Sequence, residues 1–288
     1  MLTTINQTAK NNIKSDYFYP NRNEKAYTSV WDELPLWSAP FGLKLLEIVN
    51  YKKNIKVLDI GSGTGFPLIE IAQRLGETSE FYGIDPWETA IVRLKEKTEF
   101  MQLNNIKLFD CKSEEMPFDD NFFNLIVSNN GINNAENPTL VLKECYRTAA
   151  LGAQLIITAN LPGTFALFYE TLTEILLKEE KYFVIEYLIS HINQKRKSIK
   201  ENIEMISQSG FNIRNVYEEQ FVMKFMDGDA FLKHYFIKNN FLNTWIDLLQ
   251  PTNCADYLLE QTKNRLNELA MESDLQMNVP FVVIDCIK

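Results

Sequence analysis

The stretch VLDIGSGTGFPLIEIA, residues 57–72, places three glycines in five positions between an apolar run and a helix-like pattern. Glycine loses more backbone entropy on folding than any other residue, so its clustering indicates that something approaches the backbone closely. A strand that contains Asp59, followed by Gly61, Gly63 and Gly65 and then by a helix, is typical of a backbone cradle for a nucleotide-like ligand. The stretch therefore predicts a ligand site at the carboxyl end of the first strand.

The chain from about residue 56 alternates short, β-branched apolar runs with helical patterns. The strand-like runs are 56–60, 80–85, 105–111, 123–129 and 154–160. The helical patterns between them are 67–75, 88–100 and 139–149. Alternation of this kind implies right-handed crossovers and a parallel sheet covered on both faces. We therefore predict an α/β fold of the doubly wound type with a mostly parallel sheet.

The second half of the chain departs from this alternation. Helical patterns cover 165–209, 229–249 and 256–272, and the strand-like segments are 211–225 and 278–288. The extra helices are typical of a cap inserted into the second half of the sheet. We divide the chain into an N-terminal helical and aromatic lid segment (1–50), a cofactor-binding core (51–162), and helical substrate-cap insertions with the closing strands (163–288).

Composition excludes several classes of protein. The formal net charge of −9 is wrong for a nucleic-acid binder, because such a protein replaces phosphate counterions with a basic face. Four scattered cysteines without CxxC spacing indicate reduced thiols and no metal site. The sequence has no apolar leader and no run of about 18 apolar residues, so we expect no membrane span and a cytoplasmic protein.

The glycine spacing distinguishes between nucleotide-like ligands. The dinucleotide fingerprint is GxGxxG, whereas here the third glycine, Gly65, falls one position early and Phe66 stands where the fingerprint requires glycine. A carboxylate at Asp59 repels a pyrophosphate but attracts an ammonium group through ordered water. The spacing therefore favours a ligand with a cationic amino-acid end and no phosphate, and S-adenosylmethionine (SAM) fits that description.

Residues 56–160 resemble the core of class I SAM-dependent methyltransferases that act on small molecules. The segments that carry the resemblance are VLDIGSGTG, YGIDP, LFDCKSEEMPFDDNFFNLIVSNNGINN and KECYRTAALGAQLIITA. One departure is Leu151-Gly152-Ala153 where Pro-Gly-Gly is common. The later segments around 209–225 and 279–288 look like the antiparallel closing pair of that family. The resemblance implies a seven-stranded sheet with SAM as the cofactor and S-adenosylhomocysteine as its product.

The same resemblance implies roles for individual residues. Asp85 would bind both ribose hydroxyls, and Asp110 would face the adenine amino group. The positions that we predict to bind the cofactor in this core are Asp59, Gly61, Ser62, Gly63, Gly65, Asp85, Pro86, Asp110, Cys111, Asn129 and Asn130.

The N-terminal segment is rich in aromatic residues. Helices that pack these rings on the edge of the sheet explain several of them. A sulfonium cation also gains about 0.5–2 kcal/mol from an aromatic face. We therefore add the hypothesis that Tyr27, Trp37 and Ser38 form a roof over the methionine end of the cofactor.

Methyl transfer requires alignment of a nucleophile and exclusion of water more than a catalytic triad. If the acceptor needs a base, His234 or Glu170 can serve, and the sequence does not choose between them. We expect a small-molecule acceptor, hydrophobic or aromatic in character, no nucleic-acid partner, and a monomer or homodimer. The alternatives are an NAD(P)-dependent oxidoreductase and a SAM-binding protein without catalytic activity.

Overall fold

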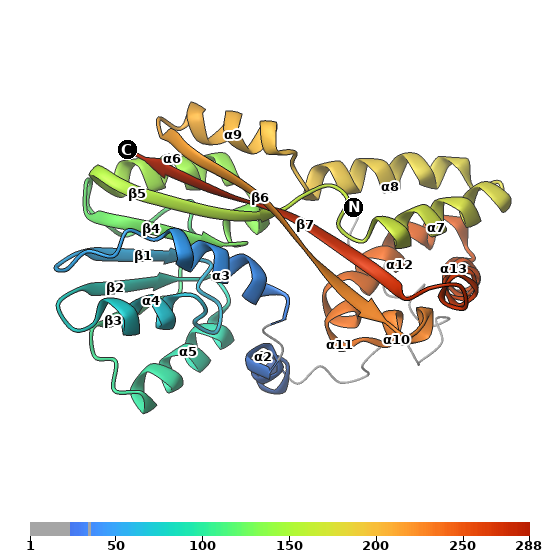
Figure 1. Cartoon of the computed structure of the whole chain (residues 1–288), viewed down its shortest axis with the longest axis horizontal. Coiled ribbons are helices and arrows are strands. Elements are labelled where there is room, and N and C mark those ends of the chain that lie inside the picture. The colour runs from blue at the N-terminus through green and yellow to red at the C-terminus, as the bar shows by residue number, and fades with distance from the viewer. Residues whose placement is uncertain (1–23, 34–35) are drawn as a thin grey trace, which may run out of the picture. The chain divides into compact units, whose positions relative to one another are not determined.

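The computed structural model describes residues 24–33 and 36–288, which form two compact units (Figure 1). The α/β unit contains, among the described residues, 24–33, 36–162, Gln194–Phe221 and Pro280–Lys288. The helical unit contains, among the described residues, Gly163–Asn193 and Val222–Val279. None of the helices within the described ranges is both long and apolar enough to span a bilayer.

The sheet contains seven strands in the order β3-β2-β1-β4-β5-β7-β6. The strands are β1 (Lys56–Ile60), β2 (Glu80–Ile84), β3 (Ile106–Phe109), β4 (Phe123–Asn129), β5 (Ala149–Asn160), β6 (Asn212–Phe225) and β7 (Leu275–Ile287). The first five strands are parallel, and β7 runs antiparallel to β5. The predicted doubly wound, mostly parallel, seven-stranded sheet is thus confirmed.

The strand order reverses direction between β1 and β4. From β1 the chain first moves outward to β2 and β3, and it then returns to add β4 on the other side of β1. In open α/β sheets a crevice forms at such a point, outside the carboxyl ends of the strands. The glycine stretch follows β1 directly, so the fold places it at this crevice.

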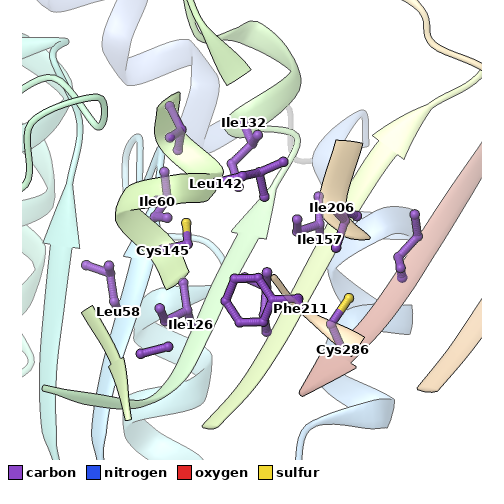
Figure 2. Packing of buried hydrophobic residues seen from close by; sticks show 14 of the residues in the cluster. Leu58, Ile60, Ile126, Ile132, Leu142, Cys145, Ile157, Ile206, Phe211 and Cys286 are labelled. Carbon is purple, nitrogen blue, oxygen red and sulfur yellow. The ribbon is translucent and has the colours of Figure 1, made fainter. Parts of the chain in front are cut away.

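Apolar side chains on alternate strand positions pack against helices on both faces of the sheet. One face, which includes Leu58, Ile126 and Ile157, forms a buried cluster with residues of α6 (Pro138–Thr148) and α9 (Ile199–Gln208) (Figure 2). The helices that contact the sheet elsewhere are α3 (Ser38–Ile48), α4 (Leu68–Leu75) and α5 (Glu88–Phe100), and α2 (Glu24–Glu33) contacts α5.

The C-terminal end of α3 is held by one buried side chain. Gln154 on β5 accepts a hydrogen bond from the Asn50 N–H at 2.8 Å and donates one to the Ile48 carbonyl at 3.0 Å. Gln154 also donates to Asp285 on β7 at 2.8 Å. The contact with the Ile48 carbonyl satisfies a helix-end group that the helix itself leaves unpaired.

The helical unit has its own aromatic core. Its helices are α7 (Ala166–Lys178), α8 (Tyr182–Lys195), α10 (Gly228–Lys233), α11 (Tyr235–Ile237), the π-helical η4 (Lys238–Leu242), α12 (Asn243–Leu249), the 3-10 turn η5 (Gln250–Thr252) and α13 (Ala255–Ala270). The rings of Phe168 and Trp245 stack at 3.9 Å between centroids, and the Trp245 indole N–H donates to the Tyr169 hydroxyl at 2.9 Å.

The segment predicted as one helical stretch over 229–249 consists of several short helices. The Asn239 and Asn240 side chains donate to the carbonyls of Tyr235 and Phe236, each four residues back. Side-chain donors at these carbonyls compete with the regular helical hydrogen bonds. The π-helical turn occurs at this position.

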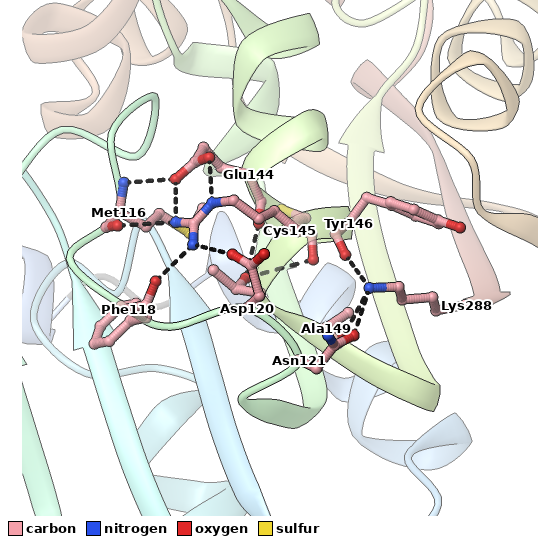
Figure 3. Close-up of polar contacts among 11 residues, drawn as sticks. Met116, Phe118, Asp120, Asn121, Glu144, Cys145, Tyr146, Ala149 and Lys288 are labelled. Carbon is pink, nitrogen blue, oxygen red and sulfur yellow. Dashed lines mark hydrogen bonds and ion pairs between the residues drawn. The ribbon is translucent and has the colours of Figure 1, made fainter.

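The amino-terminal edge of the parallel strands carries a dense polar network (Figure 3). Arg147, at the end of α6, donates to both oxygens of Glu144 at 2.7 and 2.8 Å. Its other hydrogen bonds go to Asp120 and to the carbonyls of Met116 and Phe118. The Lys288 ammonium donates to three oxygens, of Asn121, Tyr146 and Ala149. This edge lies opposite the carboxyl ends of the strands.

Candidate cofactor site

The glycine loop between β1 and α4 has a left-handed backbone at all three glycines. The φ angles are 72° at Gly61, 50° at Gly63 and 114° at Gly65. A Cβ atom at Gly61 would lie 2.7 Å from the Gly131 Cα, whereas at Gly63 no heavy atom of the described residues lies within 4 Å. Gly61 thus serves close packing of two strand ends, and Gly63 presents bare backbone to open space.

Asp85, directly after β2, holds two backbone segments together. Its Oδ2 accepts the Gly63 N–H at 2.9 Å, and its Oδ1 accepts the Trp87 N–H at 2.8 Å. Burial raises the pKa of the Asp85 carboxyl, the two N–H donors oppose that rise, and the charge of Asp110 adds to it. Each carboxyl oxygen has a second lone pair that can accept a ligand hydroxyl. Pro86 is exposed between these anchors.

Asp59, on β1, lies buried beneath the loop. Its side chain has no solvent exposure, and no described residue donates a hydrogen bond to either carboxyl oxygen. Burial, with the nearby charge of Asp85, raises the pKa of Asp59 well above its ordinary value. The Leu68 N–H opposes this rise, although it does not reach hydrogen-bonding geometry. The buried Ser62 hydroxyl likewise has no partner among the residues that the structure describes.

Two successive asparagines follow β4, and the structure gives them different environments. The Asn129 carboxamide donates to the Ser38 carbonyl at 3.1 Å and accepts from the Thr158 hydroxyl at 2.9 Å. Asn130 has a φ of 61°, and both polar atoms of its side chain are buried without a partner in the described part of the chain. Asn129 therefore connects α3, β4 and β5, while Asn130 keeps its hydrogen-bonding capacity.

The turn that follows Asn130 adds further polar groups at the carboxyl ends of the strands. A Cβ atom at Gly131 would lie 2.2 Å from the Ile60 carbonyl oxygen, so only glycine lets the ends of β1 and β4 meet here. The Asn133 side chain donates to Asn160 at the end of β5 at 3.2 Å. The Asn133 side-chain Oδ1 is buried, and no described group donates to it.

The residues after β3 form the predicted adenine side. Asp110 is exposed and Cys111 is half-buried. Burial raises the pKa of the Cys111 thiol, and the charge of Asp110 adds to the rise. The thiol is therefore protonated at neutral pH, which is unsuited to a nucleophile.

The predicted roof is only partly within the described structure. The Trp37 ring packs against Phe41 at 5.5 Å and Phe221 at 6.0 Å between centroids. Ser38 contributes its carbonyl to the Asn129 contact. Tyr27 belongs to α2, but its side chain lies outside the described residues. The hypothesis that these residues cover the cofactor stays a prediction.

The two candidate bases both belong to the helical unit. Glu170 is exposed on α7. His234, between α10 and α11, is half-buried, and burial lowers the pKa of its imidazole. Its ring is therefore neutral at pH 7, as a proton acceptor must be.

Several residues that shape the site were not predicted from the sequence. The Ser128 hydroxyl accepts the Ile132 N–H and donates to the Ile60 carbonyl, both at 3.0 Å. The Lys97 ammonium donates to the Thr64 carbonyl in the glycine loop at 2.7 Å. A polar residue at the end of an apolar strand is a signal for Ser128, but no sequence pattern indicates that Lys97 lies beside the loop.

The residues present fit SAM. Bare backbone at Gly63, a carboxylate with free lone pairs at Asp85 and uncommitted polar atoms at Asp59, Ser62 and Asn130 occur at one edge of the sheet. Negative charge and hydrogen-bond acceptors at this edge suit a ligand with a cationic amino-acid end and ribose hydroxyls. Among residues 24–33 and 36–288, no group of three His, Cys, Asp or Glu side chains is placed to hold a metal ion.

Comparison with known proteins agrees with this geometry. A family described as a methyltransferase domain matches residues 51–225. The demethylmenaquinone methyltransferase of Staphylococcus aureus is 26% identical over 182 residues, which cover 61% of this chain and 71% of that relative.

Solved structures share the fold. A SAM-dependent methyltransferase from Aquifex aeolicus superposes with a TM-score of 0.54 at 16% identity and covers 93% of this chain and 100% of its own. The YcgJ protein from Bacillus subtilis has a TM-score of 0.59 at 14% identity, covering 87% of this chain and 98% of its own. The family match spans more than half of the chain, and the protein therefore belongs to the methyltransferase-domain family as a class I SAM-dependent methyltransferase.

Proposed function

We propose that this methyltransferase binds SAM along the carboxyl ends of β1, β2 and β4 and methylates a small, uncharged acceptor. The observation that carries the proposal is the junction of Gly63 and Asp85. There an open stretch of backbone is hydrogen-bonded to a carboxylate that still has lone pairs for two hydroxyls.

The chain's own residues divide the binding task. Asp85 accepts hydrogen bonds from the ribose hydroxyls, and Gly63 lets the ligand approach the backbone. In the complex, the cationic amino-acid end favours the ionised form of Asp59 beneath the loop, against the burial that raises its pKa in the unbound protein. Asp110 and Cys111 flank the adenine, and Pro86 limits the backbone freedom beside Asp85. When bound, SAM supplies a methyl group on a sulfonium, which a nucleophile accepts by direct displacement.

Catalysis in this proposal is positional. The residues align the acceptor with the methyl group and exclude water, which can supply several kcal/mol of barrier reduction without an acid or base. The polar groups that can orient an acceptor are the Asn130 carboxamide and the Asn133 side-chain oxygen, beside Asn160. These groups are neutral donors and acceptors, so they favour an acceptor with a hydroxyl or carbonyl group over a charged one.

The acceptor itself is a matter for a screen. The relative from Staphylococcus aureus is a demethylmenaquinone methyltransferase, which makes demethylmenaquinone the first acceptor to assay. An apolar aromatic acceptor also agrees with the expectation from composition.

Where the acceptor needs deprotonation, we propose His234 before Glu170, because burial keeps its imidazole neutral. A His234→Gln variant should lose roughly 100-fold or more in kcat if the base is used, with unchanged SAM affinity. A variant with full kcat at every pH would remove His234 from the mechanism.

Calorimetric titration with SAM, S-adenosylhomocysteine and NADH tests the cofactor assignment. We expect micromolar binding of the two sulfur ligands and no binding of NADH. Asp85→Ala should raise the Kd for SAM by about 100-fold, because hydrogen bonds to a charged group contribute about 1.5–3 kcal/mol. Asp119→Ala, which removes an exposed carboxylate from the loop before β4, is the matched control.

Two outcomes would contradict the proposal. NADH binding without SAM binding would favour the oxidoreductase alternative. Tight SAM binding with no methyl transfer to any acceptor would favour a SAM-binding protein without catalytic activity.

A further inference from the structure

Helix α2 contacts α5 through a line of polar side chains. Glu24, Thr28 and Asp32 are spaced four residues apart and therefore lie on one face of α2. Their hydrogen bonds are from the Trp87 indole N–H to Glu24 at 3.0 Å, from Thr28 to Thr89 at 3.2 Å, and to Asp32 from Arg93 at 2.6 Å and from Lys97 at 2.9 Å. We call this set the α2–α5 polar seam.

One member of the seam also holds the glycine loop. The Lys97 ammonium donates both to Asp32 and to the Thr64 carbonyl, the latter at 2.7 Å. Thr64 lies between Gly63 and Gly65, two residues with left-handed backbones. A hydrogen bond to the Thr64 carbonyl therefore fixes the Thr64–Gly65 peptide plane, one residue after the bare backbone of Gly63.

The other end of the α2–α5 polar seam is connected to the Asp85 carboxylate through Trp87. Trp87 donates its backbone N–H to Asp85 and its indole N–H to Glu24. Gly63 donates to the second oxygen of Asp85. Helix α2 is thus connected to both backbone segments that hold Asp85.

The charged members of the seam are partly protected from water. Side-chain exposure is 14% for Asp32 and 23% for Lys97. Burial alone would raise the pKa of Asp32, but the hydrogen bonds from Lys97 and Arg93 outweigh it and lower the pKa. Partly buried pairs of this kind are stronger than exposed ones, yet they still weaken with salt.

We propose that Asp32 is a positioning residue for SAM binding: by holding Lys97 on the Thr64 carbonyl, it couples the docking of α2 to the conformation of the glycine loop. This inference rests on the proposed cofactor site. It adds that the affinity for SAM depends on a helix that precedes the core and on an ion pair, and that this affinity decreases with ionic strength.

The test measures the Kd for SAM by calorimetry on the full chain at low salt and at about 0.5 M salt. Asp32→Asn and Lys97→Met should each raise the Kd about tenfold at low salt, and the double variant should be no weaker than either single variant. The wild-type Kd should rise with salt, whereas the Kd of the variants should change little. Lys97→Arg keeps the charge and the donors and should restore most of the affinity.

Glu70→Gln is the matched control, because Glu70 pairs with Arg74 on the same helix, α4. The control should leave the SAM affinity and its salt dependence unchanged. Thermal unfolding of each variant shows whether a loss of affinity reflects a loss of fold. Equal Kd values for Asp32→Asn and the wild type, or additive effects in the double variant, would overturn the positioning role. A wild-type protein that binds no SAM would instead overturn the proposed function.

Discussion

The two edges of the parallel sheet, at the amino and carboxyl ends of its strands, differ in how their polar groups are hydrogen-bonded. At the amino-terminal edge Arg147 makes five hydrogen bonds between 2.7 and 3.1 Å, and Lys288 makes three (Figure 3). At the carboxyl edge Asp59, Ser62 and Asn130 have buried polar atoms without a partner in the described chain. Buried polar groups are normally hydrogen-bonded, so this contrast indicates that the two ends of the strands have different roles.

The satisfied edge serves stability. Its donors close the loop before β4 onto the end of α6 and fix the entry of β4 and β5 into the sheet. The polar groups without partners at the carboxyl ends of the strands destabilise the unbound protein, because burying a polar group without a hydrogen bond costs free energy. A ligand that forms hydrogen bonds with these groups recovers that free energy on binding. Residues kept for ligand binding therefore reduce the stability of the unbound protein.

The largest effect is expected at the satisfied edge. Arg147→Met keeps much of the aliphatic side chain, but it leaves the carbonyls of Met116 and Phe118 without the Arg147 donor and leaves Glu144 with the Met116 N–H as its donor. The free energy of unfolding should fall by about 2–3 kcal/mol in urea titrations. The Kd for SAM should stay within about twofold of the wild-type value.

Arg74→Met, which breaks an exposed pair, should cost less than about 1 kcal/mol and serves as the control. A parallel loss of stability and SAM affinity in Arg147→Met would show that the two edges are not independent.

A matched pair of glycines compares the edges directly. Gly63 and Gly152 both have positive φ and open space around a built Cβ, but Gly63 lies at the carboxyl edge and Gly152 at the opposite edge. Alanine at either position should cost about 1 kcal/mol of stability from backbone strain. Only Gly63→Ala should also raise the Kd for SAM, by about tenfold or more, because the methyl group occupies the ligand's approach. Equal SAM affinity in both variants would contradict the assignment of Gly63.

The smallest effect concerns the buried carboxylate of Asp59. Because folding raises the pKa of Asp59, its ionisation costs more free energy in the folded protein than in the unfolded chain. The contribution of Asp59 to the free energy of unfolding therefore falls as the pH rises above 3.8 toward the folded-state pKa. Asp59→Asn removes this ionisation. Relative to wild type, the variant should therefore gain stability progressively as the pH rises above 3.8. Urea unfolding curves whose difference is independent of pH would contradict a raised pKa.

The order of the elements and the place of the ligand loop were predictable from the chain. Strand and helix periodicity are local properties, and they placed β1, β4 and α5 at the bounds found in the structure. The glycine triplet and Asp85 also stand out in the sequence, because the proposed cofactor role requires fixed residue types at short spacing. The helical stretch over 229–249 was less predictable, because side chains of Asn239 and Asn240 interrupt it.

The partners of the site residues were decided only by the tertiary structure. Asn129 and Asn130 are adjacent and identical in type, yet contacts with Ser38 and Thr158 saturate the first and leave the second uncommitted. Lys97 meets the glycine loop 33 residues away in the sequence, and it meets Asp32 65 residues away. Sequence periodicity indicates which face of an element is buried, but it does not indicate which distant side chain will lie opposite. The backbone cradle is therefore a property of the sequence, whereas the groups that position it result from packing between elements far apart in the chain.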